Sequence, residues 1–161
     1  MPARWLRFLL AAPLLASGTA AGCSLVDRGC VAPVSGSISY YGSSVPPPFH
    51  VEWTITLDGD GGRFEVTPGY GSAQRWAADF RPDPTLVAAV CTRVVEAPEE
   101  QNPPPGSAVI TADLRDGSDR SVRKRAVATG SGGLYTAVKA AVPETTWTTV
   151  YGEYERWSDQ Q

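Results

Sequence analysis

Residues 51–67 read VEWTITLDGDGGRFEVT, and this run predicts a β-hairpin. Apolar and polar residues alternate on both sides of a turn, and the apolar ones are Trp53, Ile55, Leu57, Phe64 and Val66. A period of two residues is typical of strands with one buried face. The turn at 58–62 combines aspartate with glycine, as tight hairpin turns do. One face of the hairpin must therefore be covered by other parts of the chain.

The chain on both sides of the hairpin continues with strand and helix patterns. Further alternating segments predict strands at 74–80, 108–115, 120–128 and 145–157, with a short edge strand at 37–41. One helix is expected to begin at Pro84, after the capping residue Asp83, and to stop before Pro98. A second helix is expected from Ser131 to Pro143.

These elements predict an α+β fold: a single domain in which an antiparallel sheet of about five to six strands carries two helices on one face. The globular domain is expected at residues 49–161, after a tether and a proline-rich lead-in at 23–48. One shared core is expected, formed by Trp53, Ile55, Trp76, Phe80, Leu86, Val90 and Leu134. The order of elements resembles that of small bacterial protease-inhibitor and lipoprotein domains, in which a strand meander meets two helices.

The N-terminal residues predict export. Arg4 and Arg7 flank an apolar run that ends in small residues before Cys23, which is typical of a secretory signal peptide at 1–22. Residues 20–23, Ala-Ala-Gly-Cys, resemble the lipobox of bacterial lipoproteins. That resemblance implies that Cys23 is lipidated, begins the mature chain and anchors it to the cell membrane. A plain signal peptidase site of the Ala-x-Ala type is the alternative.

The cysteine count bears on the same question. The chain has three cysteines, and an exported protein with an odd number needs an explanation for the unpaired one. Assigning Cys23 to lipid leaves Cys30 and Cys91 to form a disulfide. The alternatives are a Cys23–Cys30 ring with Cys91 buried and free, or a reactive thiol at Cys91.

Net charge and the absence of known motifs limit the partners, cofactors and catalytic sites that the sequence predicts. The net charge of −3 falls to −5 when residues 1–22 are removed with their two arginines, which argues against a nucleic-acid partner. No motif for a metal, a phosphate or another cofactor is present, so none is expected. His50 is the one histidine, and no nucleophile motif surrounds any serine. We therefore expect His50 to be a solvated residue at the entrance to a strand.

Several segments are candidate interaction surfaces. Four aromatic residues crowd the last predicted strand and cannot all point inward, so they form a candidate binding surface: Trp147, Tyr151, Tyr154 and Trp157. The competing interpretation is that Trp157 folds back over the core. Prolines at 46–48 lie between Tyr40–Tyr41 and Phe49, which indicates a recognition segment or a stiff lead-in to the first strand. The acidic, proline-rich loop 96–106 is a further docking candidate.

The segment 120–128 carries cations on both of its faces. Such charges protect an edge strand against aggregation, or they contact anionic phospholipid or a phosphate-bearing wall polymer.

Together these features predict a lipid-anchored, extracytoplasmic binding or interaction module at the bacterial cell surface, without catalysis. Its expected partners are the membrane, through the lipid, and an envelope protein or a wall polymer. The alternative is a small secreted hydrolase or hydrolase (protease) inhibitor acting at the cell envelope. A pocket that holds two carboxylates, or His50, would favour an enzyme.

Overall fold

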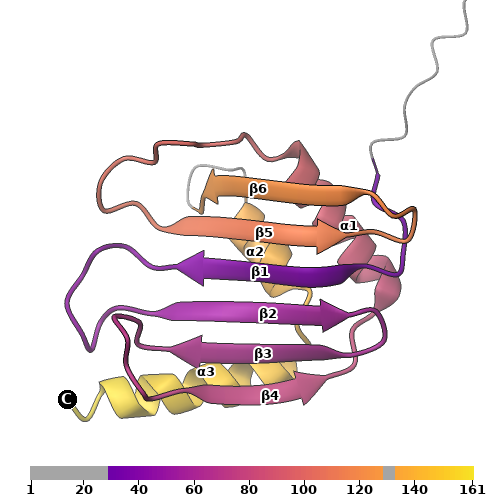
Figure 1. Cartoon of the computed structure of the whole chain (residues 1–161). Helices are drawn as coiled ribbons and strands as arrows, with labels where there is room; N and C mark the ends of the chain where they lie inside the picture. The colour runs from indigo at the N-terminus through magenta and orange to yellow at the C-terminus, as the bar shows by residue number, and fades with distance from the viewer. Residues whose placement is uncertain (1–28, 129–132) are drawn as a thin grey trace, which may run out of the picture.

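A six-stranded antiparallel sheet forms the centre of the protein, with helices packed on one of its faces (Figure 1). The computed structural model describes residues 29–128 and 133–161. The strand order is β4-β3-β2-β1-β5-β6, and every neighbouring pair is antiparallel. The strands are β1 Ser35–Tyr41, β2 Glu52–Asp58, β3 Gly62–Thr67, β4 Trp76–Phe80, β5 Val109–Arg115 and β6 Ser121–Val127. The predicted α+β class and single domain are confirmed.

Three helices follow the capping and apolar patterns of the sequence. They are α1 Pro84–Glu96, α2 Leu134–Lys139 and α3 Glu144–Ser158. Helix α1 begins as predicted, because the Asp83 carboxylate accepts hydrogen bonds from the amides of Thr85 at 2.8 Å and Leu86 at 3.2 Å. Its buried side chains are those of Val87, Val90, Cys91 and Val94. Helix α2 is shorter than predicted, and the expected start at Ser131 lies outside the described residues.

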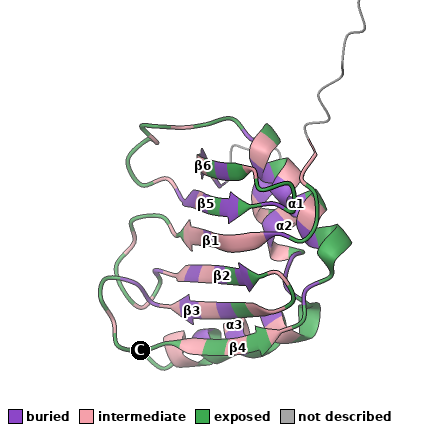
Figure 2. Ribbon diagram, turned by 45° about the vertical axis from the view of Figure 1, so that its right-hand side comes forward, coloured by how far each residue is buried: buried purple, intermediate pink, exposed green. Residues whose placement is uncertain are grey.

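The helix-facing side of the sheet carries the core. Paired residues on neighbouring strands fall into layers, one of which runs through Ile38, Ile55, Phe64, Ala78 and Ala112. The opposite face carries hydroxyl and charged side chains, as expected for an antiparallel sheet with one face in water. Figure 2 shows this alternation of buried and exposed residues along the strands. The hairpin at 51–67 is confirmed as β2 and β3.

The last element is a helix, and the prediction of a strand at 145–157 is wrong. Side chains at Trp147, Val150 and Tyr154 are buried and follow helical spacing. The β-forming threonines are accommodated because the Thr149 hydroxyl donates to the Thr145 carbonyl, one helical turn earlier, at 2.8 Å. Pro143 sits at the N-cap, where it removes no helical hydrogen bond. Burial of one helical face therefore outweighs the strand propensity of these residues.

Strand β1 lies at the centre of the sheet, so the prediction of a short edge strand at 37–41 is also wrong. It pairs with β2 on one side and β5 on the other, and Ile38 is 1% exposed. The folded domain thus begins before residue 49. Gly36 has a φ of +118°, and a Cβ there would collide with the Asp113 carbonyl oxygen of β5. This glycine lets the two central strands approach.

Most of the expected core residues do share one core. Trp53, Ile55, Val90 and Leu134 are buried, and Trp76 and Phe80 pack against them in half-buried positions. Leu86 is the exception, because 41% of its surface is exposed at the start of α1. It lies on the solvent side of the helix, one residue before the buried Val87.

Candidate functional site

The four aromatic residues predicted as a binding surface line the inner face of α3. Trp147 and Tyr154 are each 5% exposed, and Tyr151 and Trp157 are half-buried against the core. The Trp147 ring stacks between the rings of Phe64 of β3 and Tyr151. The distances between ring centres are 4.6 Å to Phe64 and 5.5 Å to Tyr151. These side chains therefore belong to the packing between helix and sheet, and the prediction that they form a binding surface needs correction. The cause is the change from strand to helix, which puts all four on one face.

The half-buried tyrosines of this aromatic layer are kept in their neutral form. Burial raises the pKa of Tyr151 well above its usual value, and the nearby hydroxyls of Tyr135 and Tyr154 raise it further. Burial also raises the pKa values of Tyr135 and Tyr40. A phenol that stays protonated at physiological pH is a hydrogen-bond donor and a ring for packing. It is not a base.

Tyr154 connects α3 to the loop at 42–51, between β1 and β2. Its hydroxyl group donates toward the carbonyl oxygens of Pro48 and His50, both at 3.1 Å. The Ser158 hydroxyl, one turn further along α3, donates to the same Pro48 carbonyl at 3.2 Å. Side chains of α3 therefore hold the backbone of the proline-rich loop in place. Burial raises the pKa of Tyr154, so its hydroxyl remains a donor.

His50 is buried at the end of this loop, and the prediction of a solvated histidine is wrong. Only 5% of it is exposed. Its Nδ1 lies 3.0 Å from the Ser43 carbonyl oxygen, and its Nε2 lies 3.0 Å from Oε1 of Glu52. The ring is thus held at both of its nitrogens, by the backbone of the loop and by a side chain of β2. The arrangement closes the loop. Within the part of the chain that the structure describes, the His50 ring forms no hydrogen bond with a serine, threonine or cysteine side chain.

Tyr70 joins the same loop from the turn between β3 and β4. Its ring packs on the His50 ring at 4.3 Å, and its hydroxyl donates to the Val45 carbonyl at 3.0 Å. Tyr70 has a φ of +49°, a left-handed conformation that is uncommon for an aromatic residue. Unfavourable backbone geometry of this kind persists where surrounding contacts hold it, and it is frequent at functional sites. No local pattern in the sequence marks Tyr70 as part of this group.

Three exposed aromatic residues gather at this end of the sheet. Tyr41 is 45% exposed, Phe49 is 73% exposed and Tyr70 is 60% exposed. Tyr41 ends β1, Phe49 follows the prolines, and Tyr70 lies in the turn that contacts their loop. We call Tyr41, Phe49 and Tyr70 the distal patch. Of the five large exposed hydrophobic residues among those described, it contains three.

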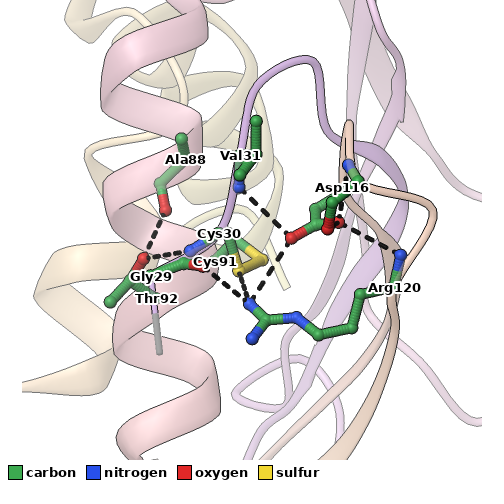
Figure 3. The surroundings of a disulfide bond; sticks show 9 residues. Gly29, Cys30, Val31, Ala88, Cys91, Thr92, Asp116 and Arg120 are labelled. Atoms are coloured by element: carbon green, nitrogen blue, oxygen red, sulfur yellow. Dashed lines mark hydrogen bonds and ion pairs between the residues drawn. A yellow bond between two sulfur atoms is a disulfide. The ribbon is translucent and has the colours of Figure 1, made fainter. Parts of the chain in front are cut away.

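The opposite end of the sheet holds the N-terminal segment (Figure 3). Cys30 and Cys91 are joined by a disulfide, with their Cα atoms 5.8 Å apart, which confirms the predicted pair. The Cys30 amide also donates to the Thr92 hydroxyl of α1 at 2.8 Å. Arg120 donates to the Gly29 carbonyl at 3.0 Å and to the Cys30 sulfur at 3.3 Å. We call these contacts, together with those of Asp116, the N-terminal clamp.

Asp116 completes the clamp from the turn between β5 and β6. It is 4% exposed, and it accepts hydrogen bonds from the Val31 amide at 3.2 Å and from the Ser118 hydroxyl at 2.6 Å. These hydrogen bonds, with that of Ser118 first, hold the pKa of Asp116 at about 2. Gly117 donates its amide to the Val31 carbonyl at 2.7 Å. A Cβ at Gly117 would collide with the Ala32 carbonyl, so the approach needs glycine.

Comparison with known proteins gives no relative from which a role could be transferred. No protein-family model matches the chain, and no curated protein is significantly similar to it. Function must therefore be inferred from the two ends of the sheet.

Two further properties concern the described residues as a whole. Within residues 29–128 and 133–161, no three histidine, cysteine, aspartate or glutamate side chains group together as a metal site would require. The same residues contain no helix of the length and hydrophobicity needed to cross a membrane. The predicted lipid-attachment residue, Cys23, lies outside the described part of the chain.

Proposed function

We propose that the protein is a lipid-anchored, extracytoplasmic binding module that acts without catalysis at the bacterial cell surface. Cys23 would carry the lipid, and the distal patch would contact an envelope protein or a wall polymer. The observation that carries this proposal is the position of the two ends. The clamp fastens residues 29–31 to one end of the sheet, and the distal patch lies at the other end.

Chain length supports the anchored arrangement. Cys30 lies seven positions after Cys23, so the clamp lies within about 25 Å of the anchor whatever path the chain takes. Strands β1 and β5 each have seven residues and place the two ends of the sheet about 20 Å apart. In this arrangement the clamp would stay near the membrane, and the distal patch would lie at the end of the sheet away from the attachment point.

The chemistry of the distal patch suits binding. Its rings are uncharged, and exposed aromatic rings pack on the apolar faces of sugars and on apolar side chains. The patch is supported from inside by Tyr154 and His50, so its loop is positioned before a partner arrives. Such preorganisation reduces the entropy that binding costs.

Intact-mass measurement of the protein extracted from host membranes tests the anchor. We expect a chain that begins at Cys23, carries a diacylglyceryl group and lacks two hydrogens for the Cys30–Cys91 disulfide. The Cys23→Ser variant, which keeps that disulfide, should leave the membrane fraction and appear in the soluble extracytoplasmic fraction. An unlipidated chain that starts elsewhere would refute the anchor.

A photo-crosslinking amino acid at position 49 tests the distal patch. Position 86 is the matched control, because Leu86 is also apolar and exposed but lies on α1. In host cells we expect adducts from position 49 only, with an envelope protein or with wall material that muramidase releases. Equal labelling from both positions, or none from either, would contradict a role for the patch.

A further inference from the structure

Strand β6 forms one edge of the sheet and has β5 as its neighbour on one side only. The Asp116 amide donates a hydrogen bond to the Arg120 carbonyl at 3.1 Å, and the Ala128 amide donates one to the Ala108 carbonyl at 2.8 Å. Along a strand of an antiparallel pair, every second residue directs its backbone N–H and C=O groups toward the neighbouring strand. In β6 these are the even-numbered residues from 120 to 128, whose backbone groups point toward β5. The backbone N–H and C=O groups of Ser121, Arg123 and Arg125 therefore point outward from the sheet edge.

Part of this edge is already occupied by the chain itself. The loop that follows α1 passes beside β6, and the Glu100 amide donates to the Arg125 carbonyl at 2.8 Å. This loop is acidic and rich in proline. Among the described residues, no backbone group pairs with the outward groups of Ser121 and Arg123. The edge is thus covered at its far half and open at the half nearer the clamp.

A groove runs along the open half. It has a volume of about 230 Å³ and is lined by Val95 of α1 and by residues 120–124 of the turn and β6. Cationic side chains dominate its rim, and they belong to Arg120, Arg123 and Lys124. Asp113 lies 3.1 Å from the Arg123 guanidinium, and Asp116 is buried beneath Arg120. Three cations and two carboxylates leave a net excess of one positive charge along the groove.

We propose that the open half of the β6 edge, residues 121–123, binds an extended acidic peptide as a seventh strand. The outward N–H and C=O groups of Ser121 and Arg123 supply the backbone hydrogen bonds, as in other cases of strand addition. Side chains of the added strand alternate between the two faces. Those opposite Arg123 are acidic, and their neighbours are apolar and rest on Val122 and Val95.

The charges favour a different partner over a second copy of this chain. Two β6 strands paired antiparallel about residue 123 would place Arg123 opposite Arg123 and bring the other arginines close, which is unfavourable. The loop that follows α1 shows that the outer edge of this strand accepts a backbone partner, because the Glu100 amide donates to the Arg125 carbonyl. The proposal concerns a surface separate from the distal patch, and it does not depend on lipidation of Cys23.

Hydrogen exchange detected by mass spectrometry tests the proposal on the full chain purified in detergent. The probe is a capped seven-residue peptide that alternates glutamate and valine, and its control alternates lysine and valine. Outward amides exchange fast in the free protein, so the glutamate peptide should slow exchange in residues 120–125 at least fivefold. Its dissociation constant should rise about tenfold between 50 and 300 mM salt, because the charges are exposed.

Two substitutions at position 123 distinguish the contribution of the backbone N–H group to peptide binding from that of the side-chain charge. Arg123→Gln keeps the outward N–H group, and we expect a two- to fivefold loss of affinity. Arg123→Pro also removes that group, at a position where proline breaks no bond to β5, and should weaken binding at least tenfold more. A thermal unfolding curve for each variant checks that the domain is still folded.

Three outcomes would overturn the proposal. The first is slow exchange of residues 121–123 before the peptide is added. The second is equal binding of the lysine peptide, or equal affinity of the Pro and Gln variants. The third is protection of this segment by anionic phosphatidylglycerol vesicles and not by the glutamate peptide, which would make the edge a lipid contact. Failure of this test leaves the mass and crosslinking tests of the proposed function unaffected.

Discussion

The Tyr154 hydroxyl gives the sharpest test of how the distal patch is built. Replacing Tyr154 with Phe keeps the ring, which packs edge-on against Trp76 at 5.8 Å, and removes only the donor to the Pro48 and His50 carbonyls. The loop at 42–51 then loses its main polar link to α3. We expect lower stability and faster local opening of this loop.

The magnitude follows from the two acceptors. The Pro48 carbonyl keeps the Ser158 hydroxyl at 3.2 Å, so it remains satisfied. The His50 carbonyl belongs to a buried residue and loses the one side-chain donor that reaches it from the described residues. A buried hydrogen bond contributes about 1 kcal/mol net, and an acceptor left without a partner adds to the loss. We therefore expect Tyr154→Phe to lower the free energy of unfolding by about 1–2 kcal/mol.

Urea denaturation measures this loss, and Tyr151→Phe is the matched control. Tyr151 lies on the same helix and is half-buried, but its hydroxyl donates to no group among the described residues. Removing it should change the unfolding free energy by less than about 0.5 kcal/mol. Hydrogen exchange should show faster exchange in loop 42–51 for Tyr154→Phe only. Equal losses from both substitutions, or unchanged exchange in the loop, would refute the support assigned to Tyr154.

Three further predictions concern the clamp and the core. Replacing both Cys30 and Cys91 with alanine should lower the unfolding free energy in urea by about 4 kcal/mol, because the bridge spans 61 residues. The pKa of Asp116 is about 2, below its unfolded value near 4, so its stabilising effect is complete above pH 4 and disappears toward pH 2. In the Asp116→Asn variant, the midpoint of urea unfolding should depend less on pH between pH 4 and pH 2. Val90→Ala should lower the thermal midpoint clearly, whereas Leu86→Ala, at an exposed site, should not.

The parts of the fold that the sequence predicts well are those set by local chemistry. The alternation in 51–67 predicts the hairpin, and Asp83 before Pro84 predicts the start of α1, because cap and strand signals lie within a few residues. The odd number of cysteines predicts the Cys30–Cys91 pair once Cys23 is assigned to lipid. Each of these signals has few alternatives and needs no knowledge of distant partners.

The errors arise where tertiary contacts decide. Residues 145–157 are rich in strand formers, yet Trp147, Val150, Tyr151 and Tyr154 also fit the i, i+3, i+4, i+7 spacing of a helix. That spacing places every large residue on one face, whereas alternation divides them, and this signal could have identified the helix. The central position of β1 had no comparable signal, because its partner β5 lies about 70 residues away.

The distal patch was only partly visible in the sequence for the same reason. Tyr41 and Phe49 flank the prolines, and their neighbourhood indicated a recognition segment. Tyr70 joins them through a turn in another hairpin and a left-handed backbone conformation that no local pattern specifies. Burial of His50 depends on acceptors from Ser43 and Glu52, which become aligned only when the loop closes.

Different helices support the two sides of the sheet. Helix α3 packs against β3 and β4 and holds the loop of the distal patch through Tyr154. Helix α1 packs against β6 and α2 and holds the clamp through Cys91. The edge groove lies in this second half, since Val95 lines it. A change in α3 should therefore disturb the distal patch and leave the clamp and the β6 edge in place. Because their supports differ, the two proposed surfaces can be lost independently, and binding to one need not alter the other.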